Sequence, residues 1–306
     1  MSAVPLPASA DDELPLWLPS GSQKAFAILT RPRQPEGTGV LLLHSGAHTM
    51  TAGTGRLWAR LARGLAGSGS WVIRLDFTGS GDSSGEFERR HDGQPAADVA
   101  AGIDELMGRG AERLVVAGHC FGAVPAMALA VVRPAVRRVV LLSPPLTWVQ
   151  RGQTVIQAGG PAPLGAVVRS TLTREVASRF VTDPEYRRWL ARRARRRVRS
   201  LAPTVRRAPA DAGVPGDSTA TGRVLLGKEW LGQLTRNGVG VTIVYGSEDW
   251  MYADFLAACE GGLSSVISDP AVEVVLHPES IHALDRSSAQ DVVAAQVTAA
   301  VRALAG

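Results

Sequence analysis

The sequence predicts an α/β fold, in which a mostly parallel sheet is flanked by helices and a helical cap is inserted late in the chain. Short apolar runs alternate with segments of helical periodicity, which is typical of parallel strands joined by crossover helices. The alternation stops over residues 147–237, where apolar residues recur every four positions, and then it resumes. The predicted core therefore comprises residues 1–146 and 238–306, and the predicted cap comprises residues 147–237.

The predicted strands are short runs rich in Val, Ile and Leu, each followed by Gly, Ser, Asp or His. They are Val40–Leu43, Trp71–Leu75, Leu114–Ala117, Val139–Leu142, Val239–Tyr245 and Val272–Leu276. The predicted helices of the core are Arg56–Leu65, Ala96–Met107, Ala123–Val132, Tyr252–Cys259 and Ala289–Leu304. Pro125 is compatible with the third of these helices, because proline is tolerated in the first helical turn.

The predicted cap contains two amphipathic helical patterns and a loop. One pattern runs from Leu164 to Phe180 and the other from Leu190 to Val198, with an apolar residue at every fourth position. The segment Ala208–Gly222 is rich in Pro, Gly, Ser, Thr and Ala, which predicts a loop.

The segment Gly118-His119-Cys120-Phe121-Gly122 follows a predicted buried strand and opens a predicted helix. This is the context of a nucleophile elbow, G-x-S-x-G, with Cys in place of Ser. The glycines permit a sharp turn that presents the central side chain, and the helix N-terminus behind it favours a thiolate. Cys120 is therefore the candidate nucleophile. The alternative is a small buried side chain at the end of a strand, as is common for free cysteine.

A catalytic cysteine also needs a base and an acid that orients the base. Asp249 follows one predicted strand and His282 lies in the loop after the next, so both can reach the end of the sheet that carries the elbow. The order nucleophile, acid, base matches the order used with this type of elbow. Glu248 and Asp254 are alternative acids. His277 is the alternative base, although it lies where its strand ends rather than in the loop.

The backbone N–H groups of Gly46, Ala47 and Phe121 are the candidate oxyanion hole. The first two lie in the loop after the strand Val40–Leu43, and two such donors stabilise the tetrahedral intermediate of acyl transfer. His48 and His119 are further candidates for the base. We interpret both as loop-shaping residues, because a histidine in the loop after the last strand already fits that role.

Three segments carry a family resemblance: Arg60–Arg63, Arg74–Glu86, and the elbow with the alanine that follows it, G-x-C-x-G-A. Together they resemble α/β-hydrolases of the serine-aminopeptidase-like group, which implies the α/β-hydrolase fold over residues 38–146 and 238–306. The elbow is similar to the subset with Cys at this position. That subset includes hydrolases associated with exosortase systems, Cys-dependent thioesterases and Dieckmann-type cyclases of natural-product pathways.

These residues predict acyl transfer through a Cys-His-Asp triad and a covalent acyl-thioester intermediate. The leading hypothesis is hydrolysis of a small-molecule ester or thioester, as in a thioesterase. A second hypothesis is an acyltransferase or cyclase that releases a carrier- or CoA-bound acyl chain in natural-product biosynthesis, because an acyl-thioester favours amine, thiol or carbon acceptors more than an oxyester does. A third is a non-catalytic relative that binds a ligand or partner, against which the order of the triad argues.

Composition excludes several other classes of protein. A chain with 45% hydrophobic and 20% charged residues can bury a sizeable core and is not mostly disordered. Two cysteines exclude a disulfide framework and a Cys-rich zinc site, and we expect no metal or cofactor. No run approaches the ~18 apolar residues of a membrane span. The first residues lack the positive charge and apolar run of a secretory signal, so a cytoplasmic location is expected.

Positive charge is concentrated in one segment of the predicted cap. Between Pro184 and Arg207 there are ten arginines and one acidic residue, in a chain whose net charge is +5. The candidate docking residues are Arg192, Arg195, Arg196 and Arg199. A charged helix face is usually a solvated one, but arginine binds phosphate in a bidentate manner. An acyl carrier protein or coenzyme A is therefore the candidate partner, whereas the lack of a nucleic-acid motif predicts no specific nucleic-acid binding.

Overall fold

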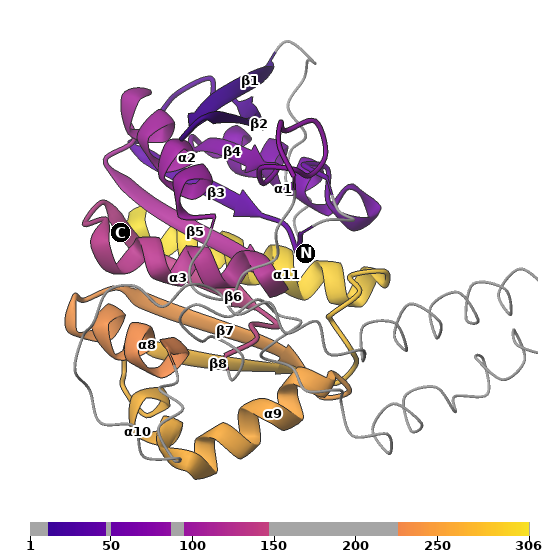
Figure 1. Ribbon diagram of the computed structural model, residues 1–306, viewed down its shortest axis with the longest axis vertical. Helices are drawn as coiled ribbons and strands as arrows, with labels where there is room; N and C mark the ends of the chain where they lie inside the picture. The colour runs from indigo at the N-terminus through magenta and orange to yellow at the C-terminus, as the bar shows by residue number, and fades with distance from the viewer. Residues whose placement is uncertain (1–11, 47–49, 87–94, 147–225, 306) are drawn as a thin grey trace, which may run out of the picture. The chain divides into compact units, whose positions relative to one another are not determined.

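The computed structural model describes residues 12–46, 50–86, 95–146 and 226–305, and at its centre lies a sheet of eight strands in the order β1-β2-β4-β3-β5-β6-β7-β8 (Figure 1). β1 and β2 form an antiparallel hairpin, β2 is antiparallel to β4, and the other neighbouring pairs are parallel. The strands are β1 (Glu13–Ser20), β2 (Gln23–Thr30), β3 (Thr38–Leu43), β4 (Trp71–Leu75), β5 (Arg113–His119), β6 (Val136–Leu142), β7 (Gly240–Gly246) and β8 (Val272–His277).

Helices cover both faces of the sheet (Figure 1). One face carries α2 (Ala96–Gly108), α3 (Ala123–Val132), α8 (Leu226–Arg236) and α9 (Trp250–Ala258), and the other carries α1 (Leu57–Gly67) and α11 (Ser287–Ala305). Short helical segments complete the described part: η2 (Thr54–Arg56), η3 (Cys120–Gly122), η4 (Cys259–Leu263) and α10 (Ser264–Ile267). The predicted α/β fold with a mostly parallel sheet is thus confirmed.

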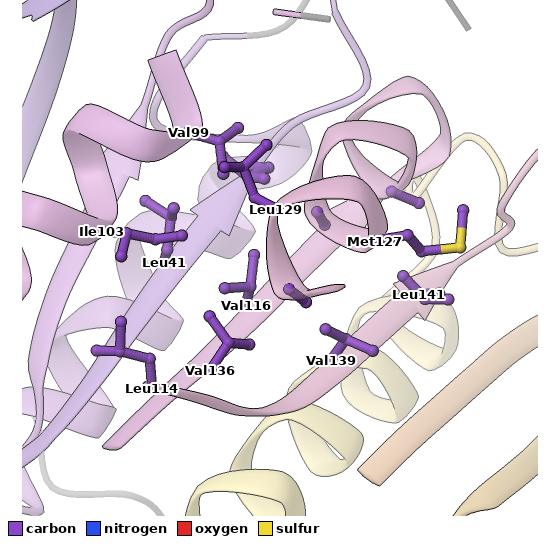
Figure 2. Packing of buried hydrophobic residues seen from close by; sticks show 14 of the residues in the cluster. Leu41, Val99, Ile103, Leu114, Val116, Met127, Leu129, Val136, Val139 and Leu141 are labelled. Carbon is purple, nitrogen blue, oxygen red and sulfur yellow. The ribbon is translucent and has the colours of Figure 1, made fainter. Parts of the chain in front are cut away.

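The alternation of side chains along the strands divides the core into two layers. In β3, Leu41 and Leu43 belong to the layer under α2 and α3, whereas Val40 and Leu42 belong to the layer under α1 and α11. Because strand side chains point to opposite faces in turn, strands that are apolar on both faces must be covered on both. Figure 2 shows the first of these layers, where side chains of α2 and α3 lie over those of β3, β5 and β6.

The hairpin of β1 and β2 is the part of the sheet that the sequence reading missed. β1 contains Pro15 and Pro19, and proline within a run argues against a strand unless the strand lies at an edge. Among the strands that the structure describes, β1 is indeed an edge strand, paired with β2 alone. The apolar residues of β2, such as Ala27 and Leu29, are fully buried and extend the sheet by pairing with β4.

The glycine-rich turn that follows β4 is fastened to β2 on one side and to α2 on the other. The N–H of Phe26 donates to the Ser83 hydroxyl at 2.6 Å. The fully buried Asp98 carboxylate, in the first turn of α2, accepts from the N–H of Thr78 at 2.7 Å and from its hydroxyl at 2.5 Å. Asp98 also accepts a hydrogen bond from the hydroxyl of Ser20, so one carboxylate joins α2, the turn and β1.

The chain divides into two compact units, one of residues Met1–Ala158 with Arg223–Gly306 and the other of residues Gly159–Gly222. The second unit lies entirely outside the described residues. Helix α8, which the sequence reading included in the cap, belongs to the first unit and packs against α3. The cap of residues 147–237 stays a prediction over residues 147–225, where the structure describes nothing. Among the described helices, none is long and apolar enough to cross a membrane.

Glu13 connects the edge strand β1 to the rest of the core through two arginines. Its carboxylate lies 2.9 Å from the guanidinium of Arg74 in β4 and 3.0 Å from that of Arg63 in α1. The Arg74 side chain is 3% exposed and that of Arg63 is 44% exposed. Burial lowers the pKa of the Arg74 guanidinium, and the negative charge of Glu13 opposes that shift. Glu13 is therefore the counter-ion of a buried positive charge.

We expect Glu13→Gln to destabilise the protein by about 3 kcal/mol, because a buried guanidinium that loses its counter-ion is strongly unfavourable. Arg63→Met is the matched control: it removes the exposed half of the same cluster and should cost less than about 1 kcal/mol. Urea unfolding at neutral pH measures both. Equal losses of unfolding free energy in the two variants would show that the buried pair of Glu13 and Arg74 stabilises the protein no more than the exposed pair of Glu13 and Arg63 does.

Candidate active site

The backbone at Cys120 adopts a sharp turn between strand and helix. β5 runs directly into η3 and then α3, and Cys120 stands at the junction with φ +50°. This is the left-handed region, which residues with a side chain seldom occupy and which is enriched at functional sites. The side chain is half-buried. The strained turn that the G-x-C-x-G pattern predicts is therefore present in the structure.

The two glycines of the pattern have a steric role. A Cβ atom on Gly118 would lie 2.4 Å from the carbonyl oxygen of Gly122, and a Cβ on Gly122 would lie 2.5 Å from the carbonyl oxygen of His44. Both distances are far below van der Waals contact, so neither position accepts a side chain without a shift of the backbone. The second contact also places the loop after β3 directly against the elbow.

Asp249 precedes α9 and is 4% exposed, and its carboxylate is an acceptor for several groups at this edge of the sheet. Oδ2 accepts from the Ser143 hydroxyl at 2.9 Å, from the N–H of Gly246 at 3.0 Å and from the N–H of Ile281 at 3.4 Å. Oδ1 accepts from the N–H of His282 at 3.2 Å and from the hydroxyl of Ser280. Such bonds offset the cost of burying the charge.

The loop that carries His282 is held close to the end of β7. A Cβ on Gly246 would lie 2.2 Å from the carbonyl oxygen of Glu279 and 2.7 Å from the nitrogen of Ile281, so the loop passes directly over this glycine. The side chain of Ile281 is fully buried. Together with the bonds to Asp249, this close packing fixes the backbone that leads into His282.

Two aromatic rings lie next to that of His282. Its ring centroid lies 5.8 Å from that of His119 and 6.2 Å from that of Trp250. His119 is 4% exposed. Burial, with a further contribution from the charge of His282, lowers the pKa of His119 to about 3 from its ordinary value of 6.5. His119, the last residue of β5, is therefore a neutral ring that packs against His282, and its interpretation as a loop-shaping residue stays a prediction.

The structure brings the predicted triad residues to one edge of the sheet through their neighbours. Asp249 binds the backbone of His282, and the ring of His282 packs on the residue that precedes Cys120. The side-chain bonds of a working triad, from Asp249 to the His282 ring and from that ring to the Cys120 sulfur, stay predictions. Of the alternative residues, Glu248 is exposed, and Nε2 of His277 lies 3.9 Å from a carboxylate oxygen of the partly exposed Glu279.

The predicted oxyanion donors have different positions in the structure. The N–H of Gly46 donates to Nδ1 of His44 at 3.0 Å, so this donor is already engaged within its own loop. Phe121 directly follows Cys120 in η3, and its side chain is 1% exposed. Ala47 lies outside the described residues, as do His48 and the arginines Arg192, Arg195, Arg196 and Arg199. No group of three or more potential metal-ligating side chains occurs among the residues that the structure describes.

Two serines contribute to the site without having been predicted. Ser143 follows β6 with φ +43° and is fully buried, and Ser280 precedes the backbone groups that Asp249 binds. Ser143 could have been found from the sequence, because it directly follows a buried parallel strand at the same edge as the elbow. Nothing in the sequence around Ser280 indicates its role.

Comparison with known proteins agrees with this geometry. Residues 40–296 match the model of the family described as "Alpha/beta hydrolase family". No curated protein matches the chain in sequence.

Many solved structures share the fold at low identity. An esterase from Pyrococcus furiosus superposes with a TM-score of 0.60 at 14% identity, covering 96% of this chain and 91% of the esterase. A thioesterase domain from the curacin biosynthetic pathway gives a TM-score of 0.50 at 21% identity, with coverage of 94% and 98%. A proline iminopeptidase from Mycobacterium smegmatis gives 0.51 at 21% identity, with coverage of 95% and 100%. At such identities the likeness concerns the fold alone.

We expect Gly246→Ala to lower kcat/KM by roughly 100-fold, because the new methyl group displaces the loop that carries His282 and small misplacements of reacting groups cost about that much. Gly108→Ala is the matched control, since no described heavy atom outside the backbone of its own helix lies within 4 Å of a Cβ at that position. Steady-state kinetics on an activated ester measures both variants. Wild-type kinetics in Gly246→Ala would contradict the close approach.

His119 should make stability depend on pH. Its pKa is lowered in the folded state, so below pH 6.5 the unfolded chain takes up a proton that the folded chain does not. The free energy of unfolding therefore decreases as the pH is lowered. We expect His119→Gln to lose about 3 kcal/mol less than the wild type between pH 7 and pH 4. Urea unfolding at the two pH values measures this, with His277→Gln as the control. A loss in His119→Gln as large as in the wild type would contradict it.

Proposed function

Because the chain belongs to the alpha/beta hydrolase family, we propose that it transfers acyl groups through Cys120 and hydrolyses a small-molecule ester or thioester. The observation that carries the proposal is the left-handed backbone of a cysteine at the turn from β5 into a helix. A buried structural cysteine needs no such strain, whereas a nucleophile that must stand clear of the sheet does. The esterase and thioesterase among the similar folds act on acyl compounds of the same two kinds, as their names state.

In the proposed first step, His282 takes the proton of the Cys120 thiol and the sulfur attacks the carbonyl carbon of the substrate. The carbonyl π electrons move to oxygen and form an oxyanion, which backbone N–H groups at the elbow stabilise. When the intermediate collapses, the bond to the leaving alcohol or thiol breaks, and His282 gives that group its proton. The acyl group is then bound to Cys120 as a thioester.

In the second step, His282 takes a proton from water, and the resulting hydroxide attacks the thioester. Collapse of this intermediate releases the carboxylic acid, and the sulfur of Cys120 regains its proton. Asp249 holds the loop of His282 through the backbone and, in this proposal, orients the imidazole and stabilises its charged form. No metal or cofactor takes part in these steps.

A second candidate function is transfer of the acyl group to an amine, thiol or carbon acceptor, including ring closure on a carrier-bound chain. The observation that favours it is the cysteine itself, because its acyl-thioester reacts with such acceptors more readily, relative to water, than an acyl-serine does. The arginines of residues 184–207 would bind a phosphate-bearing donor, either coenzyme A or an acyl carrier protein. The third hypothesis is a non-catalytic protein that binds a ligand or partner, and under this hypothesis no acyl transfer occurs.

Incubation with an uncharged acyl-N-acetylcysteamine thioester, followed by intact-mass measurement and product analysis, tests the proposal. We expect an acyl adduct on Cys120 and release of the free acid. Cys120→Ala should lower turnover by on the order of 10⁴-fold. Cys120→Ser should keep the geometry but shift products toward the free acid when another acceptor competes, because its intermediate is an oxyester.

Cys259→Ala is the matched control and should keep full activity. Cys259 is a partly buried residue packed against the core, and burial raises the pKa of its thiol, so brief iodoacetamide treatment should label Cys120 first. If Cys120→Ala retains more than a hundredth of the activity, the nucleophile lies elsewhere. If the wild type forms neither adduct nor acid, the binding protein becomes the better reading.

A further inference from the structure

The buried side chains of His44 and Asp76 form a pair that has no role in the proposed acyl-transfer steps. Nε2 of His44 lies 3.3 Å from Oδ1 of Asp76, and both side chains are 1% exposed. Burying a carboxylate and an imidazole to this degree costs desolvation free energy unless each side chain has a polar partner.

The hydrogen bonding of His44 determines its tautomer. Nδ1 accepts a hydrogen bond from the N–H of Gly46, so Nδ1 carries no proton. The proton of the neutral ring is then on Nε2, the nitrogen that faces Asp76. The carboxylate thus favours the one tautomer in which His44 can hold the loop after β3.

The loop that His44 holds lies directly against the elbow. The carbonyl oxygen of His44 would be 2.5 Å from a Cβ on Gly122, two residues after the nucleophile. A series of rings makes a second connection: the centroids of His44 and Phe77 lie 5.1 Å apart, and those of Phe77 and Phe121 lie 5.4 Å apart, each pair with edge-to-face geometry. The position of the loop and that of Phe121, whose N–H follows the nucleophile, are therefore set by the same packed group.

Asp76 itself is held by the turn that follows β4. Its Oδ2 accepts from the N–H of Asp82 at 3.3 Å, and a Cβ on Gly81 would lie 1.9 Å from that oxygen, so only glycine lets the turn close over the carboxylate. Gly81 has φ +53°, a further reason for glycine there. The buried guanidinium of Arg74 balances part of the negative charge of Asp76.

We propose that Asp76, acting through His44, is a positioning residue for the oxyanion-binding backbone of the acyl-transfer reaction. This inference rests on the proposed function, since an oxyanion forms only if Cys120 attacks a carbonyl group of the substrate. Asp76 touches neither substrate nor nucleophile. It fixes the tautomer and orientation of His44, which fixes the loop from His44 to Gly46 against the elbow and so maintains the geometry in which the carbonyl oxygen of the substrate is received.

The alternative is that Asp76 only anchors the turn after β4. Asp98 provides the matched control, because it is equally buried and also anchors this turn through Thr78, but its hydrogen bonds are with Thr78 and Ser20 rather than with His44. Asp98→Asn therefore disturbs the turn and leaves the pair of His44 and Asp76 in place. A role confined to the turn predicts the same behaviour for Asp76→Asn and Asp98→Asn.

Two reactions of Cys120 separate positioning from damage to the fold. Attack on the uncharged acyl-N-acetylcysteamine thioester develops an oxyanion, whereas alkylation by iodoacetamide is a displacement at carbon that develops none. We expect Asp76→Asn to lower kcat/KM for release of N-acetylcysteamine, measured at low substrate concentration, by roughly 10- to 100-fold, with most of the loss in kcat. The rate of alkylation of Cys120 should stay within about twofold of the wild-type rate. Asp98→Asn should leave the ratio of the two rates unchanged.

A second variant covers the case in which Asp76→Asn does not fold. His44→Asn keeps a side-chain acceptor for Gly46 but lacks the ring that faces Asp76, and it should likewise slow acylation more than alkylation. Where both single variants fold, the double variant should be no slower than the slower single one, because the two residues act in series. Acylation of Asp76→Asn at the wild-type rate, or an equal loss of both reactions in Asp76→Asn and Asp98→Asn, would overturn the proposal. Failure of the wild type to be acylated would instead overturn the proposed function.

Discussion

The left-handed backbone of Cys120 is the constraint on which the rest of the site depends. A residue with a side chain occupies this region only when its surroundings compensate for the strain, and here the compensation is steric. Gly118 and Gly122 allow the strand, the turn and the loop after β3 to approach more closely than any side chain would permit. The parallel strands β3 and β6 flank β5, which leads into the turn, and the side chain at its apex is half-buried.

Buried carboxylates give this edge of the sheet its shape. Asp76 and Asp249 follow parallel strands directly or after a short turn, and Asp98 opens a helix beside them. Asp249 accepts hydrogen bonds from the loop of His282, whereas Asp98 and Asp76 both accept them from the turn after β4, Asp98 from Thr78 and Asp76 from Asp82. Since the ends of parallel strands leave their loops without partners from the sheet, a buried negative charge is an efficient way to order several of them at once.

Much of this architecture follows from local sequence patterns. The alternation of apolar runs and helical periodicity predicts the parallel strands and their helices, because buried parallel strands are apolar on both faces and are told apart by their Gly, Ser and Asp boundaries. Three features are not encoded in these local patterns. The prolines of β1 hide an edge strand, the engagement of Gly46 by His44 depends on a ring orientation that no spacing encodes, and the role of Ser280 depends on a carboxylate 31 positions earlier in the chain. Local sequence patterns predict the strands, the helices and the residues that follow them, whereas the tertiary structure determines which polar groups pair.

The hairpin of β1 and β2 determines how far the N-terminal segment of this protein can be truncated. The family match begins at residue 40, after both strands have ended. A protein trimmed to that boundary would keep the elbow, Asp249 and His282, yet it would lose Ser20 and the backbone of Phe26, to which Asp98 and the turn around Asp76 are attached. It would also leave the ladder edge of β4 open to pairing with other chains. The hairpin of β1 and β2 thus stabilises the turn after β4 and the edge of the sheet, although it lies outside the region of family similarity.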